Sequence, residues 1–595
     1  MRIPAKNDGN SNSYDKLLIT LSGILLCLSF AMLFIPVREK ILQIGEALLQ
    51  RTVKDREYWL NMLLKWSLAA IASVIMADII FFLNQKKAGG PLDRILLERK
   101  PWTAAILSFL AILLSYCVLN DGHNWGGDFS QYISQAISID KGSVQQQIQS
   151  NEFIIQNSPL GLGPTVYPWG TPLLLVPVYW LFGFNLFAFK LPGVLSFGIF
   201  VVIIFYYYSN KFRTPYAVFL TLLFSVNSSF ILFTNNILSD IHFLLFSTIS
   251  IVYLQKLLSE KSTKKQLIFG FIFGFSSAVS FQFRTNGIVL IITLFCFHVL
   301  LILACFFQKS KFLKKASNNI SKPYLPAHAA PYLIFILFSI AIAAFLPGGG
   351  ESHFDYISKI SIRTMLSNIV YYSKLMSSFF PFPMLSSAFY AASLICFLVG
   401  LKKKFIEELP VIIYSTGTMV LLILWPATQG LRFLFPIIPF YILFSAYGGK
   451  ALLSKLPLIF KRLANFLLIY ICALMLVTSS ISAYRNLSQN RLTDNGAFSS
   501  DAVETYEYIR KNTLDSDVIV FRKPRVLWLT TNRLGFSLGK DQSKLRVADY
   551  ILFSNDFDNR DSMNDVMEKN KNTIQLDQVF TNSRFRLYRI IHAEE

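Results

Sequence analysis

The sequence predicts a polytopic α-helical membrane protein with about 13 transmembrane helices and a small extracytoplasmic α/β domain at its C-terminal end. Three observations indicate this fold class. Of the 595 residues, 53% are hydrophobic and 15% are charged, whereas soluble domains carry roughly 25% charged residues. Apolar runs of about 20 residues, the length of a helix that crosses a bilayer, recur along the chain. After about residue 484 the composition becomes that of a soluble domain.

The apolar runs are separated by short loops, except for two long polar loops at 120–185 and 348–383. Within the first long loop, the run 173–182 is short and contains Pro177, which favours an interfacial or half-inserted helix. The first apolar run lacks a small-residue cleavage site, so we interpret it as an anchor. The expected spans are 17–36, 59–83, 102–119, 186–208, 215–233, 238–257, 266–283, 286–307, 331–347, 384–400, 409–427, 432–448 and 464–483.

Basic residues are distributed unevenly between the loops and predict the orientation. With the 84–101 loop in the cytoplasm, the six loops on that side hold 22 Lys and Arg against five Asp and Glu. This positive-inside bias places both long loops and the C-terminal segment outside the cytoplasmic (inner) membrane of the cell. The 37–58 hairpin is the exception, because it would face outward with five basic residues.

The net charge of +21 does not indicate a nucleic-acid partner. The basic excess lies in the short loops, while the segment from Tyr484 to the end has 17 Lys and Arg against 16 Asp and Glu. The six cysteines lie in or at the edges of apolar runs and form no CxxC pair. This pattern predicts neither a disulfide framework nor a cysteine metal site.

The segment 484–595 combines helical and strand-like patterns. Asp501-Ala-Val-Glu504 resembles a capping box, and apolar residues at 503, 506 and 509 predict a helix. A second helix is expected over Arg560–Asn570. Runs of β-branched and aromatic residues predict strands at Asp517–Phe521, Tyr550–Phe553, Ile574–Phe580 and Phe585–Ile591.

Several ionisable residues lie at the outer ends of the apolar runs, where the cost of burying charge marks functional candidates. A carboxylate there can take a proton from an acceptor hydroxyl or amine or bind a divalent cation, and arginine grips a phosphate with a bidentate fork. A sugar donor whose phosphate lies at the membrane–water boundary would meet all these groups at one depth, and polyprenyl-phosphate sugars are such donors. The candidates are Asp128, Lys190, Asp240, Arg284 and Arg432.

Each candidate also has a structural interpretation. Asp128 and Asp240 could be helix N-caps, and Arg284 and Arg432 could snorkel or form structural ion pairs.

Lys190 and the other polar residues near the outer ends of the runs also have structural interpretations. Tyr132, Tyr167 and Lys190 are typical of residues that anchor a protein at the membrane interface. His123, His242 and His353 lack the spacing of a zinc motif. A metal site that joins His353 to Asp128 and Asp240 stays open if the fold brings them together.

Several segments resemble a known superfamily. Gly127-Asp128-Phe-Ser-Gln-Tyr132 resembles the acidic motif of the GT-C membrane glycosyltransferases, in particular the bacterial aminoarabinose transferases that modify lipid A and the protein O-mannosyltransferases of glycosyltransferase family 39 type. Tyr167-Pro-Trp-Gly170, Ser239-Asp240, Arg284-Thr-Asn-Gly287 and Arg432-Phe-Leu-Phe-Pro436 resemble later landmarks, and the similarity spans about 100–595.

The resemblance implies an inverting sugar transfer from a polyprenyl-phosphate-linked donor to a lipid, glycan or protein acceptor, in contact with membrane lipids. Asp128 would be the catalytic base and Asp240 the second acidic residue. No cofactor is firmly implied, and a divalent metal ion stays open. The expected substrate-binding residues are Arg284, Arg432, Tyr132, Tyr167 and Lys190.

The chain is then expected to contain three parts. These are an additional N-terminal transmembrane hairpin with a basic loop (1–101), a GT-C-like catalytic core (102–483) and a soluble extracytoplasmic α/β domain (484–595). Two other functions stay open. A transporter, flippase or polymerase of lipid-linked polysaccharide would carry charges within its spans and paired half-chain repeats. A scaffold that presents the C-terminal domain would tolerate loss of the first-loop acids.

Overall fold

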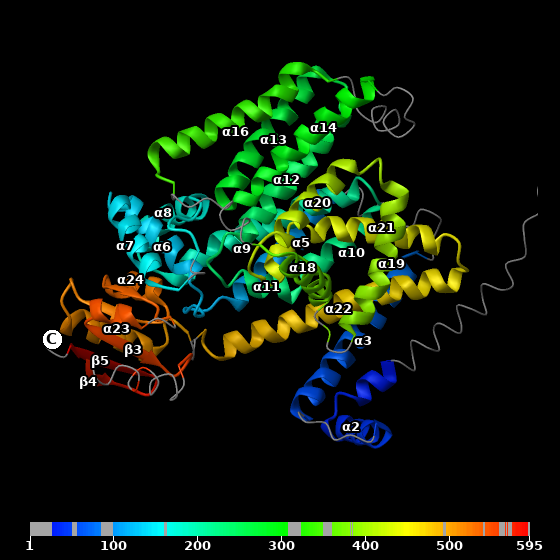
Figure 1. Cartoon of the computed structure of the whole chain (residues 1–595). Helices are drawn as coiled ribbons and strands as arrows, with labels where there is room; N and C mark the ends of the chain where they lie inside the picture. The colour runs from blue at the N-terminus through cyan, green and yellow to red at the C-terminus, as the bar shows by residue number, and fades with distance from the viewer. Residues whose placement is uncertain are drawn as a thin grey trace, which may run out of the picture.

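The protein is a bundle of apolar helices with a small sheet domain at one side (Figure 1). The computed structural model describes residues 26–49, 56–84, 99–159, 163–306, 323–348, 360–380, 382, 385–491, 496–539, 542–558, 566, 568 and 574–592.

Among these residues, nine helices are long and apolar enough to cross a membrane, and each lies at a predicted span. Three shorter apolar helices, α10 (Thr214–Ser225), α20 (Leu409–Ile423) and α21 (Ile438–Leu453), occupy three further predicted spans. The long helices are α3 (Arg56–Asn84), α5 (Lys100–Val118), α9 (Leu186–Ser209), α12 (Asp240–Ser259), α13 (Thr263–Phe283), α14 (Ile288–Phe306), α16 (Leu325–Phe345), α19 (Ser386–Lys404) and α22 (Leu458–Ser488).

Three predicted spans differ from the observed helices. The run 17–36 lies partly outside the described residues, and its described part is broken by a turn before α2 (Ile35–Leu49). The run 215–233 is two helices, because α10 stops and Asn227 caps α11 (Ser228–Phe233) by accepting a hydrogen bond from the Ser229 amide at 2.9 Å. The run 432–448 begins with a 3-10 turn, η3 (Leu431–Leu434), before α21 starts at Ile438.

The tightest crossing in the bundle is built on glycines. A Cβ on Gly400 of α19 would overlap the carbonyl oxygen of Phe444, and one on Gly448 of α21 would overlap the carbonyl oxygen of Cys396. The two helices therefore pack backbone against backbone, which only a residue without a side chain allows.

The first long loop folds into three helices that lie between the bundle and the C-terminal domain (Figure 1). They are α6 (Asp128–Asp140), α7 (Val144–Asn157) and α8 (Gly170–Phe182). The predicted short helix with Pro177 is α8, with 13 residues. Its first residue, Gly170, lies so close to α13 that a Cβ would be 2.7 Å from the carbonyl oxygen of Gln282. The second long loop contains α18 (Ile362–Leu375) and η2 (Met376–Phe379).

The C-terminal domain has a five-stranded sheet in the order β2-β1-β3-β5-β4. The strands β1, β2 and β3 are parallel, and β5 is antiparallel to both β3 and β4. The strands are β1 (Val518–Val520), β2 (Leu534–Phe536), β3 (Tyr550–Ser554), β4 (Ile574–Thr581) and β5 (Phe585–His592), and the helices are α23 (Ser500–Asn512), α24 (Pro524–Thr531) and η4 (Ser543–Val547).

The four predicted strands are confirmed as β1, β3, β4 and β5. The capping-box prediction is wrong, because α23 starts earlier, with Ser499 as its N-cap and Asp501 inside its first turn. Three elements of this domain were not predicted. They are the three-residue strand β2, the helix α24, which begins at Pro524, and the short 3-10 helix η4. The expected helix over Arg560–Asn570 lies largely outside the described residues.

Candidate active site

The site begins at Asp128, which is the first residue of α6 and follows the N-cap residue Gly127. A negative charge is favourable at the start of a helix, but Asp128 is not the N-cap, and no side chain caps this helix. The side-chain partners, however, lie on other elements. Tyr167 donates its hydroxyl hydrogen to Oδ1 at 2.9 Å, and Arg432 approaches Oδ2 with both terminal nitrogens at 3.3 Å. The Asp128 side chain is 37% exposed, so it is accessible to a substrate.

Asp240 is the first residue of α12 and is almost completely buried, with a side chain only 2% exposed. Its Oδ1 is hydrogen-bonded to Arg284, and its Oδ2 lies 3.7 Å from Arg432. A carboxylate is buried in this way only when cations compensate its charge. Asp240 therefore fixes the two arginines.

The two arginines reach the acids from separate elements. Arg284 is the C-cap residue of α13, and Arg432 lies in η3 at the entry to α21. Both guanidinium groups lie over the ring of Phe433, at 4.2 and 5.3 Å from its centre. The start of α12, the end of α13, the entry to α21 and the start of α6 thus meet at one end of the bundle.

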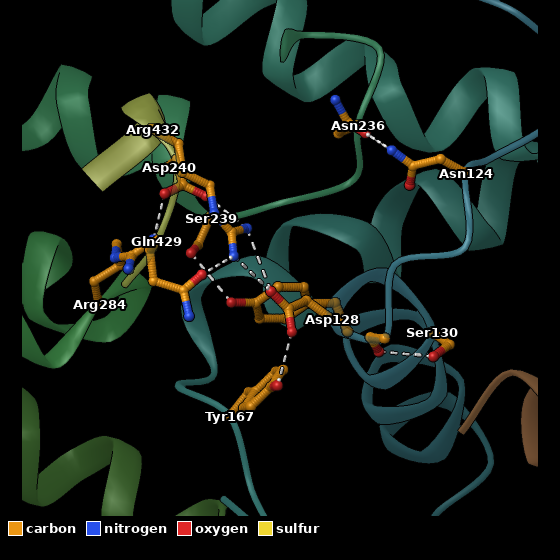
Figure 2. Close-up of polar contacts among 12 residues, drawn as sticks. Asn124, Asp128, Ser130, Tyr167, Asn236, Ser239, Asp240, Arg284, Gln429 and Arg432 are labelled. Carbon is orange, nitrogen blue, oxygen red and sulfur yellow. Dashed lines mark hydrogen bonds and ion pairs between the residues drawn. The ribbon is translucent and has the colours of Figure 1, made fainter. Parts of the chain in front are cut away.

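Figure 2 shows Arg432 between Asp128 and Asp240, with Arg284 beyond Asp240. Gln429 accepts a further hydrogen bond from Arg432 at 3.0 Å. The acids and arginines balance in charge, so we call these four residues, Asp128, Asp240, Arg284 and Arg432, the neutral cluster.

Two tyrosines border the neutral cluster. Tyr132 is buried on α6, donates a hydrogen bond to Ser239 at 3.1 Å and lies beside Tyr167, with ring centres 5.2 Å apart. Burial raises the pKa of Tyr132 and Tyr167 above the ordinary range for tyrosine, and the negative charge of Asp128 adds to the effect. Both phenols therefore stay protonated and can donate.

Lys190 is not part of the neutral cluster. Its ammonium group is buried and contacts Asn120 twice, at 2.8 and 2.7 Å, the Gly122 carbonyl at 2.6 Å and Asn235 at 2.8 Å. An ammonium group has three hydrogens, so these protein oxygens already satisfy it. Lys190 joins the loop after α5 to the loop before α12, and this geometry does not support the predicted role in substrate binding.

His123 makes a second connection between the same two loops. Its Nε2 must accept the hydrogen bond from the Ile237 amide at 3.1 Å, so Nδ1 carries the hydrogen and donates to the Asn124 carbonyl at 3.0 Å. The ring stacks on Phe129, with centres 3.9 Å apart. Burial lowers the pKa of His123 to about 3, so the imidazole is neutral.

The residues present do not form a divalent metal site. Arg432 lies between Asp128 and Asp240, and within the described part of the chain no three His, Cys, Asp or Glu side chains gather to hold an ion. His353, the third predicted ligand, lies outside the described residues.

The structure adds residues that the sequence did not single out as site residues. Gln429 contacts Arg432, and Ser239 contacts Tyr132. Arg525 of the C-terminal domain donates to the Tyr167 hydroxyl at 2.9 Å. Arg525 lies 358 positions after Tyr167, so only the tertiary fold reveals the contact.

One protein-family model and several solved structures are similar to this chain. The family described as dolichyl-phosphate-mannose-protein mannosyltransferase matches residues 166–342, a region that includes Tyr167, Asp240 and Arg284. No protein of curated function matches the sequence significantly.

Among solved structures, ArnT from Cupriavidus metallidurans bound to undecaprenyl phosphate is 12% identical, with a TM-score of 0.51 over 82% of this chain and 98% of ArnT. The same protein in the apo state gives 12% identity and a TM-score of 0.51 over 81% and 97%. The archaeal oligosaccharyltransferase AglB from Archaeoglobus fulgidus gives 10% identity and a TM-score of 0.46 over 83% and 75%.

The fold is like that of ArnT. The predicted resemblance to the GT-C superfamily and the predicted fold class are therefore confirmed. Together, the family match and the fold support a multi-span membrane glycosyltransferase of the GT-C type.

Proposed function

We propose that this protein moves a sugar from a polyprenyl-phosphate-linked donor to an acceptor at the outer face of the cytoplasmic membrane, with inversion at the sugar carbon. The observation that carries the proposal is the neutral cluster. It places the accessible carboxylate of Asp128 beside Arg432, and buried Asp240 links Arg432 to Arg284. A lipid phosphate and a polar acceptor would meet at this depth.

The exposures of the two acids suggest different roles. Asp128 is accessible and would take the proton from the acceptor O–H or N–H. The acceptor then attacks the sugar C1, and the bond from C1 to the phosphate oxygen breaks. The polyprenyl phosphate leaves with the electron pair. One displacement of this kind inverts the configuration at C1.

The arginines supply the charge that the leaving group needs. Arg284 and Arg432 can donate several hydrogen bonds to a phosphate in a fixed fork, and buried Asp240 holds both in place. ArnT, which shares the fold, was solved with undecaprenyl phosphate. That ligand is the kind of lipid carrier that the proposed donor would release.

The test compares two carboxylates of the same helix. Purified protein in liposomes is given a panel of radiolabelled undecaprenyl-phosphate sugars with lipid and peptide acceptors, and the release of undecaprenyl phosphate is measured. Asp128→Asn should slow turnover at least about 100-fold, since general bases contribute roughly 10²- to 10⁴-fold.

Asp140→Asn is the matched control. Asp140 ends α6 and accepts a hydrogen bond from Trp180 at 2.7 Å, away from the neutral cluster, so this variant should keep the wild-type rate. Wild-type turnover in a folded Asp128→Asn protein would rule out the proposed mechanism.

A further inference from the structure

The C-terminal domain inserts one buried arginine into the wall of the candidate site. Arg525 is only 4% exposed and lies in the first turn of α24, after Pro524. A cation in this position faces the positive end of the helix dipole, so the helix itself does not favour it. Hydrogen bonds from the Arg525 side chain to another segment compensate for this unfavourable position of the charge.

Among the described residues, the hydrogen-bond partners of the Arg525 side chain all lie in the first long loop. Its Nε donates to Asn151 at 2.9 Å, one terminal nitrogen donates to the Pro164 carbonyl at 3.0 Å, and the other donates to the Tyr167 hydroxyl at 2.9 Å. Arginine keeps its protons in proteins and cannot accept a hydrogen bond. The Tyr167 oxygen is therefore the acceptor in the last contact.

This direction fixes the next hydrogen bond. Because the Tyr167 oxygen accepts from Arg525, its own hydrogen is free to point at Asp128, and the distance from the hydroxyl to Oδ1 is 2.9 Å. A cation behind a phenol polarises its O–H bond and makes it a stronger donor. One hydrogen bond thus runs from Arg525 to Tyr167 and the next from Tyr167 to the Asp128 carboxylate, and each bond has one possible donor.

We propose that Arg525 and Tyr167 are positioning residues through which the C-terminal domain orients the Asp128 carboxylate. This inference rests on the proposed function, because it assumes that Asp128 is the base. It assigns the C-terminal domain a part in the chemistry of the transmembrane core.

The C-terminal domain also holds the chain on the other side of Asp128. The Trp125 indole donates to Asp556 at 2.7 Å, and the Ala497 amide donates to the His123 carbonyl at 3.0 Å. The C-terminal domain therefore holds the segment that runs directly into Asp128 and also, through Arg525, the segment around Tyr167. Its contacts with these two segments set the position of the carboxylate.

Other charged groups also act on Asp128. Arg432 from η3 and Lys523 beside α24 are charged, whereas Tyr132 on α6 and His123 in the preceding loop are neutral ionisable groups. Arg284 and Asp240 are linked to Asp128 through Arg432. The experiment must separate the effect of Tyr167 and Arg525 from theirs, so it changes no other charge near the site.

The test measures kcat and the donor KM in the liposome assay for Tyr167→Phe, Arg525→Gln and the double variant. Loss of the hydrogen bond leaves the Asp128 carboxylate without the partner that orients it, and a misplaced catalytic group slows the chemical step. The value of kcat should therefore fall about 10-fold, with a smaller change in the donor KM.

The double variant distinguishes a relay from two separate effects. If Arg525 acts through Tyr167, the double variant should show the same loss of kcat as Tyr167→Phe alone, because contacts in one network are not additive. A loss of kcat in the double variant equal to the product of the two single losses would overturn the relay. Should Arg525→Gln fail to fold, Arg525→Lys keeps the charge without the fork and should give an intermediate kcat.

Arg533→Gln is the control for stability alone. Arg533 is equally buried in the same domain, but it bonds to Thr513, Asp515 and backbone carbonyls within that domain. Its loss should lower the thermal stability and leave kcat unchanged. An inactive Asp128→Asn together with wild-type kcat in Tyr167→Phe and Arg525→Gln would overturn the relay only. An active Asp128→Asn would overturn the proposed function as well.

Discussion

At the scale of single residues, the two acids differ in what surrounds them. Asp128 is partly exposed and shares one arginine with Asp240, which is buried against two. An exposed carboxylate can exchange a protein partner for a substrate at little cost, whereas a buried one cannot lose its partners without a large penalty. An aspartate is thus suited to exchange its partner for a substrate at position 128 and to hold the arginines in place at position 240.

His123 gives a prediction about pH at this scale. Its folded pKa is about 3, below the unfolded value of about 6.5. The unfolded chain therefore binds a proton first as the pH falls, and stability is lost below about pH 6.5 until the folded pKa is reached. The loss from this residue should be at most about 1.4 kcal/mol per pH unit.

The measurement is thermal unfolding of the detergent-solubilised protein from pH 7.5 to 4.5. His123→Gln removes the titrating ring and can still accept from the Ile237 amide, so its stability should depend less steeply on pH than that of the wild type. Equal slopes for both proteins would show that His123 does not contribute.

The sequence could identify the members of the neutral cluster but not their partners. Asp128, Asp240, Arg284 and Arg432 are recognisable because each is a charge at the end of an apolar run. The pairing of Asp128 with Arg432 spans 304 positions, and no local pattern encodes it. Lys190 was predicted to bind substrate for the same reason as the arginines, and only its oxygen partners show that it is a structural residue.

At the scale of elements, most helices follow from hydrophobic length, and most misplaced boundaries involve proline or short polar residues. Asn227 divides the run 215–233, and Pro439 near the start of α21 delays that helix past Arg432. A hydropathy pattern averages over such residues. It therefore predicted the spans well but could not show that Arg432 lies in a 3-10 turn, where it is free to reach the acids.

The glycine crossing of α19 and α21 gives a prediction at this scale. Gly448→Ala places a methyl group on the Cys396 carbonyl, whereas the nearest contact of a Cβ on neighbouring Gly449 would be the Cys396 sulfur at 3.9 Å. Overpacking costs about 1–3 kcal/mol. Gly448→Ala should therefore lower the Tm by several degrees in a detergent unfolding assay, and Gly449→Ala should leave it within about one degree. Similar Tm values for the two variants would contradict the backbone packing.

At the scale of the whole molecule, the neutral cluster and the basic loops lie at opposite ends of the bundle. Asp240 opens α12 and Lys256 lies in its last turn, about 24 Å further along at 1.5 Å per residue. The short 258–265 loop that follows is basic. Lysine-rich loops favour the cytoplasm, so we expect the neutral cluster to face outward.

Fusions to reporter proteins test this orientation. Alkaline phosphatase joined after residue 595 should be active and green fluorescent protein at the same place should be dark, because each reporter folds on one side only. Fusions that end at Lys261, between α12 and α13, should give the reverse result. A fluorescent C-terminal fusion would invert the expected topology.

The contacts between the C-terminal domain and the first long loop also set an order in time. Arg525 is separated from Asn151 by 374 positions, and Asp556 from Trp125 by 431. A chain made from its N-terminus therefore has Asp128 long before the groups that orient it exist. Asp128 reaches its final setting only when the last part of the protein has been translated and folded, so an incomplete chain carries this carboxylate without the groups that place it.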